Sequence, residues 1–150
     1  MTENKTTHTL NDLIAIARDG QEFYGEAAQK VKDAELSALF GRIAGVKAKI
    51  VSELGSAVQA AGGTPEDHGT LVGSMQKLYG GIRATLGDTQ YGYVAQLEES
   101  EDRLLHAFED TIGDNDTPPA AREAAARLLP EVRECHNVMR DRKHAMQRAA

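Results

Sequence analysis

Apolar residues recur every three or four positions along most of this chain, the spacing that keeps side chains on one face of an α-helix. Such stripes run over about residues 10–31, 34–61, 89–112 and 117–148. Gly62-Gly63 follows the second stripe and Gly113 the third, as expected where helices end. The first two helices and the last two have short connections, whereas a long crossover at about residues 62–88 joins the pairs. The pattern predicts an all-α, up-down-down-up four-helix bundle.

The segments outside the stripes define the domain. Residues 1–9 lack an apolar stretch and are predicted to be a disordered N-terminal tail, ahead of one four-helix-bundle domain over residues 10–148. Thr9, Asp33 and Thr117 have the side chains and positions expected of helix N-caps. The crossover is expected to be partly helical, over about residues 70–86. Pro130 interrupts the last stripe and predicts a kink near residues 126–130.

Two charged residues occupy inward positions of these stripes. The third stripe reads Val94, Leu97, Glu101, Leu105, Phe108, Ile112, and the second reads Leu36, Phe40, Ile43, Lys47, Ile50, Leu54, Ala57. A carboxylate that points into a bundle must be paired, protonated or bound to a metal. Lys47 is therefore expected to neutralise Glu101 across the bundle.

A wider buried polar cluster is expected around this pair. It would comprise Lys47, Glu98, Glu101, His136 and Tyr24. The alternative is a metal site in which Glu98, Glu101 and His136 hold iron, manganese or zinc. Cys135, the single cysteine, excludes an internal disulfide framework and is expected to be a small core residue.

Composition narrows the classes of function. The net charge of −6 argues against general nucleic-acid binding, which needs a basic surface. No apolar run approaches the roughly 20 residues that span a bilayer, so no membrane association is expected. The N-terminus does not have the pattern of a secretory signal, and a cytoplasmic location is the expectation.

Several segments resemble an uncharacterised bacterial family of ferritin-like four-helix-bundle proteins, a domain of unknown function. The matching segments are residues 10–14, 18–20, 24–28, 33–36 with 39–40, 62–67, 98–102 and His136. The resemblance covers nearly the whole chain. It implies a ferritin-like fold and brings no established activity.

A more distant similarity is to the rubrerythrins and related di-iron proteins, in which two helices each give a Glu and two give Glu-x-x-His. Aligned on that pattern, the ligand positions fall on Ala17, on Lys47 and Ile50, on Glu98 or Glu101, and on Arg133 and His136. Most of these residues cannot act as the expected ligands. The comparison therefore implies a degenerate di-iron site.

Three hypotheses of function follow. The favoured one is a non-enzymatic bundle without a resident cofactor, with a structural or interaction role, for example in a stress response, and acting as a homo-oligomer such as a dimer. The second is a divergent metal-binding or redox protein that handles peroxide or iron. The third is an adaptor whose basic fourth helix, with Arg140, Arg142 and Lys143, binds an acidic partner.

Overall fold

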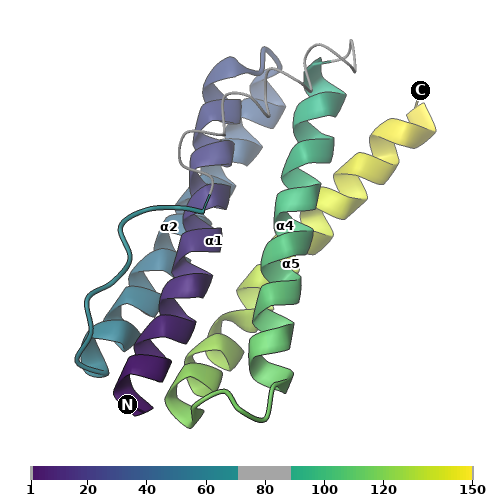
Figure 1. The fold of residues 1–150 in the computed structure, drawn as a ribbon. Helices are drawn as coiled ribbons and strands as arrows, with labels where there is room; N and C mark the ends of the chain where they lie inside the picture. The colour runs from purple at the N-terminus through teal and green to yellow at the C-terminus, as the bar shows by residue number, and fades with distance from the viewer. Residues whose placement is uncertain (1, 71–88, 150) are drawn as a thin grey trace.

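Four long helices form the bundle. The computed structural model describes residues 2–70 and 89–149, and the helices are α1 (Thr2–Lys30), α2 (Ala34–Ala60), α4 (Thr89–Gly113) and α5 (Pro119–Ala149). The helices run up, down, down and up (Figure 1), which confirms the predicted fold class. The short helix expected over residues 70–86 falls almost entirely outside the described residues.

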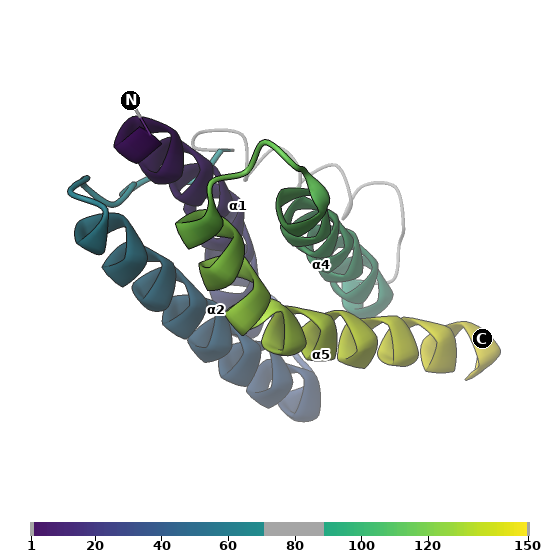
Figure 2. The same cartoon turned by 90° about the horizontal axis from the view of Figure 1, so that it is seen from below.

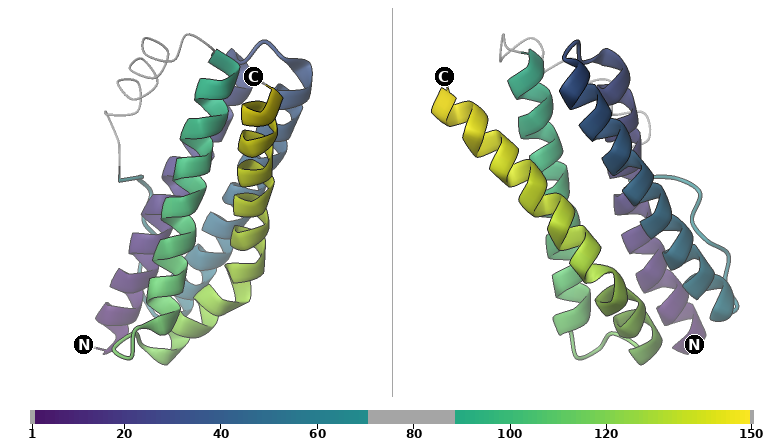
Figure 3. Two further views of the ribbon diagram at one scale, coloured as in Figure 1. Left: turned by 90° about the vertical axis from the view of Figure 1, so that its right-hand side faces the viewer. Right: turned by 180° about the vertical axis from the view of Figure 1, so that it is seen from behind.

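The helix pairs pack as two antiparallel hairpins, α1 with α2 and α4 with α5 (Figure 3). α1 also contacts α4 and α5, and α2 contacts α5. Seen along the bundle, α2 and α4 occupy opposite corners (Figure 2). Within the described ranges, none of the helices combines the length and the apolar character needed to cross a membrane.

The helix boundaries lie within about two residues of the predicted ones except at the N-terminus. Asp33 caps α2, since its side chain accepts a hydrogen bond of 2.8 Å from the Leu36 amide, and Gly62 has a positive φ of 86° just after α2. The expected disordered tail over residues 1–9 is wrong, because residues 2–9 are the first part of α1. Thr6, one turn before Leu10, is buried and extends the stripe toward the N-terminus.

The helix α5 bends, as predicted from Pro130, but is not interrupted there (Figure 2). α5 starts at Pro119, two residues after the predicted cap Thr117, and continues through Pro130 without a break. It changes direction along its length, where the ribbon passes from green to yellow (Figure 2). Pro130 is exposed, so the backbone bond that proline cannot make lies on the solvent side of the helix.

The first part of the crossover, residues 64–70, lies against α1 and forms hydrogen bonds with it (Figure 1). The Asn11 side chain bonds Thr64 and Glu66, and Arg18 donates to the Glu66 carbonyl at 2.9 Å. Further along, the buried Asp19 accepts bonds from Thr70 and Arg103. These bonds hold residues 64–70 against the bundle.

The apolar core consists of two clusters, one toward each end of the bundle. Along α2, Ile43 belongs to one cluster and Ile50 to the other, with Lys47 between them. Along α4, Leu97 and Leu104 belong to different clusters, with Glu101 between them. A polar layer therefore divides the core in the middle of the bundle.

Candidate functional site

Three side chains form this polar layer: Tyr24 from α1, Lys47 from α2 and Glu101 from α4. The Lys47 Nζ lies 2.5 Å from Glu101 Oε1, and the Tyr24 hydroxyl donates to Glu101 Oε2 at 2.5 Å. Tyr24 and Glu101 are 0 % exposed and Lys47 is 1 % exposed. Both carboxylate oxygens thus have a donor, and the charges of the pair cancel.

Lys47 and Glu101 meet across the diagonal of the bundle, and Gly20 on α1 lies beside the lysine stem. A Cβ atom at Gly20 would lie 3.7 Å from Lys47 Cε and 3.8 Å from Lys47 Cδ. These are ordinary van der Waals distances, so the lysine stem passes close to the backbone of α1 at Gly20. A long, flexible side chain is needed for this crossing, and lysine has one.

Aromatic and sulfur groups complete the layer. The Lys47 ammonium lies 5.9 Å from the centroid of the Tyr24 ring, whose neighbour Phe40 meets it edge-on at a centroid distance of 6.1 Å. Burial raises the pKa of Cys135 to about 11, although the nearby Lys47 ammonium acts in the opposite direction. The thiol is therefore neutral and unreactive at physiological pH.

The chemistry open to this layer is limited by its burial. A substrate could touch the Glu101 carboxylate only if the helices separated, because all three side chains are enclosed. A proton acceptor or nucleophile that acts on a substrate needs contact with it. In this packing the layer neutralises charge and positions helices.

A second group of polar residues lies between α4 and α5, and we call it the α4–α5 cluster. It contains Glu98 and Asp102 on α4 and His136 on α5, whose potential ligand atoms all lie within 4.8 Å of one another. His136 Nε2 lies 3.4 Å from Asp102 Oδ1, and Lys143 Nζ lies 3.1 Å from Glu98 Oε1. All three members of the cluster are partly buried.

The structure thus divides the residues that the sequence singled out. Lys47, Glu101 and Tyr24 lie together, whereas Glu98 and His136 lie in the α4–α5 cluster. Within the described part of the chain, Glu101 does not join any group of three or more potential metal ligands. The ligand set Glu98, Glu101 and His136 is therefore not assembled in this structure.

Sequence reasoning missed Asp102, which takes the place expected for Glu101. A signal was present, because Asp102 follows Glu98 by four residues and so lies on the same side of α4. Asp102 is offset from Glu101, in the apolar stripe, by about 100° around the helix axis, and it faces α5. The stripe drew attention to Glu101 instead.

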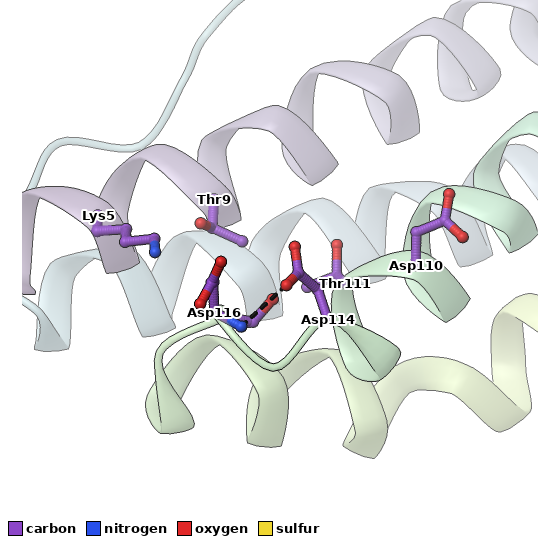
Figure 4. A pocket seen from close by; sticks show the side chains of 7 residues that line it. Lys5, Thr9, Asp110, Thr111, Asp114 and Asp116 are labelled. Carbon is purple, nitrogen blue, oxygen red and sulfur yellow. Dashed lines mark hydrogen bonds between the residues drawn. The ribbon is translucent and has the colours of Figure 1, made fainter.

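Surface hollows lie at the end of the bundle and beside Cys135. One, of about 360 Å³, is at the end of the bundle where α1 meets the α4–α5 loop (Figure 4). Its lining is Lys5, Thr9, Asp110, Thr111, Asp114, Asp116 and Thr117. Another, about 280 Å³ and mostly apolar, is lined by Val46, Pro130, Glu131, Glu134 and Cys135. The aspartates of the first hollow are exposed, as is usual for a solvated acidic surface.

Comparisons with known proteins give a family but not an activity. No curated protein and no solved structure matches the chain. Residues 5–114, which cover most of α1 and all of α2 and α4, match a family described as a domain of unknown function, DUF2383. Both Lys47 and Glu101 lie in the matched region. Since the match covers more than half of the 150 residues, the chain belongs to the DUF2383 family.

Proposed function

We propose that this protein is a non-enzymatic ferritin-like bundle with a structural or interaction role, in which a lysine replaces the dinuclear metal centre. The observation that carries the proposal is the contact of 2.5 Å between Lys47 Nζ and Glu101 Oε1 inside the bundle. The ammonium supplies the positive charge that a metal would otherwise bring to the carboxylate. The Tyr24 hydroxyl satisfies the second oxygen.

The residues around the pair support the same reading. On α1, Ala17 is buried one turn before Gly20 and has no donor atom in its side chain. On α2, Ile50 packs in the apolar core. A dinuclear centre needs several carboxylate and histidine ligands that converge. Glu101 is the one acid among the buried side chains of the layer, and it already has two partners.

An iron-loading experiment tests this proposal. The purified protein and its Glu101→Gln variant are mixed with excess ferrous iron in air, and ferrous oxidation and iron per chain after gel filtration are measured. We expect oxidation no faster than without protein and equal iron retention in both forms. Two irons per chain, lost in Glu101→Gln, would overturn the proposal. Iron bound at another place in the chain would be retained equally by wild type and by Glu101→Gln.

The basic residues of α5 give less support to the adaptor hypothesis than the central pair gives to the first proposal. Arg142 lies 2.8 Å from Glu35, Lys143 pairs with Glu98, and Arg140 lies 3.2 Å from Asp141. The three cations therefore have acidic partners within the chain. The homo-oligomer, the role in stress and the cytoplasmic location stay predictions from the sequence; light scattering after gel filtration tests the first.

A further inference from the structure

The α4–α5 cluster brings two carboxylates and an imidazole to one place without using the central polar layer. Glu98 and Asp102 project from successive turns of α4, and His136 projects from α5 toward them. The exposed fractions of the side chains are 16 % for Glu98, 14 % for His136 and 47 % for Asp102. Two helices hold the donors, and one side of the cluster is open to solvent.

The spacing of these donors suits a metal ion. Zinc binds nitrogen and carboxylate oxygen at about 2.0–2.2 Å in a tetrahedral arrangement, which puts neighbouring ligand atoms about 3.3–3.6 Å apart. His136 Nε2 and Asp102 Oδ1 are 3.4 Å apart, so this pair already has that spacing. The remaining ligand atoms lie within 4.8 Å, a gap that side-chain rotation can close.

The cluster already attracts a cation. The Lys143 ammonium lies 3.1 Å from Glu98 Oε1 and donates a hydrogen bond to it. The lysine comes from the last part of α5, and its long side chain can swing away without moving the helix. A divalent ion would compete with this single charge for the same carboxylate.

An outer partner is also present. His106 Nδ1 lies 3.4 Å from Asp102 Oδ2, the oxygen that faces away from His136. In metal sites, a group of this kind on the far oxygen orients the ligating carboxylate. His106 is exposed and follows Asp102 by one helical turn, so its contact with Asp102 is local to α4.

We propose that Glu98, Asp102 and His136 form a mononuclear site for a divalent transition-metal ion of the zinc type, with Lys143 as a displaceable occupant. Two carboxylates and one imidazole are hard and intermediate donors that suit zinc, manganese, ferrous iron or cobalt. Water completes the coordination on the open side. The site contains Asp102 and not Glu101, so its ligand set differs from that of the proposed lost centre, although Glu98 and His136 both fall at ligand positions of the di-iron pattern.

Titration calorimetry with Zn²⁺, together with the visible absorption of Co²⁺, tests the site. Wild-type protein should bind one ion per chain, and His136→Ala should bind at least about tenfold more weakly. The exposed His144 on the same helix provides the control, since His144→Ala should bind like wild type. Absence of binding, or equal binding by His136→Ala, would overturn the proposal.

Two further variants separate a site from a general structural effect. Lys143→Met should strengthen Zn²⁺ binding by up to about fivefold, the size of a partly exposed ion pair, whereas Lys49→Met should not change it. Asp102→Asn should weaken Zn²⁺ binding. Because Asp102 is half-exposed, this variant should fold normally, which circular dichroism checks. Unchanged affinity in Lys143→Met or in Asp102→Asn would contradict the assignment. Glu101→Gln should keep this binding, so the site and the proposed function fail separately.

Discussion

Replacement of Lys47 by methionine tests the physical role of the central polar layer. Methionine keeps most of the stem length that passes over Gly20 but removes the ammonium. At 2.5 Å, and with an effective dielectric constant of about 20, the lost attraction to Glu101 is about 7 kcal/mol. Much of this is offset in the folded protein by the desolvation of both charges, because their side chains are 1 % and 0 % exposed.

The net effect depends on what remains buried. Lys47→Met leaves the Glu101 carboxylate enclosed with the Tyr24 hydroxyl as its partner, so we expect a loss of about 3–5 kcal/mol in the free energy of unfolding. For a chain of 150 residues this lowers the melting temperature by roughly 10–15 °C. The double variant Lys47→Met/Glu101→Gln should lose much less than the two single variants together, because neither charge remains.

Urea unfolding monitored by circular dichroism measures these differences. Lys49→Met is the matched control, since Lys49 lies two residues further along α2, is exposed and pairs with Glu131 at 2.9 Å. This control should unfold like wild type. The reasoning fails if Lys47→Met is no less stable than Lys49→Met, or if the losses of the two single variants simply add in the double variant.

Three further predictions concern other features. Burial raises the pKa of Cys135 to about 11 from 9.0, so the thiolate is about a hundredfold rarer below pH 9. The rate of alkylation by iodoacetamide should therefore keep rising with pH and level off only near pH 11, and levelling off below pH 9 would contradict this. Gly62→Ala should destabilise the fold by about 1 kcal/mol because Gly62 has a φ of 86°, which alanine adopts with strain. Gly41→Ala, in open space on α2, should stabilise the fold by about 0.5–1 kcal/mol. Urea unfolding measures both changes, and changes of the same sign would contradict the prediction. Asp19→Ala should speed proteolysis within residues 64–70, because it removes the hydrogen-bond acceptor for Thr70 and Arg103. Asp12→Ala, at an exposed position of α1, should leave the rate of proteolysis unchanged. Equal rates in the two variants would argue against a role of Asp19 in holding this segment.

The helices and the central pair could be read from the sequence because both depend on periodicity. An apolar stripe fixes which residues of one helix face inward, and Glu101 and Lys47 each stand in such a stripe. The start of α1 was missed because Thr6, although polar, occupies a position of the stripe and is buried. Periodicity does not separate a helical threonine at the end of a stripe from a loop residue.

The α4–α5 cluster could not be read in the same way. Its formation depends on how far α4 and α5 rotate about their axes and at what height they meet, and a stripe on each helix leaves both quantities open. The sequence pattern therefore groups Glu98 and His136 with Glu101, whereas in the structure both lie beside Asp102. Long side chains add to this difficulty, since Lys143 reaches Glu98 from a position two turns beyond His136.

The position of the two opposite charges also governs which hairpins can associate. The α1–α2 hairpin brings the ammonium of Lys47, and the α4–α5 hairpin brings the carboxylate of Glu101. Two copies of α1–α2 packed face to face would bury ammonium against ammonium, and two copies of α4–α5 would bury carboxylate against carboxylate. Association of either hairpin with a copy of itself is therefore disfavoured. Each hairpin pairs preferentially with the other kind, which can belong to the same molecule or, after domain exchange, to a second molecule.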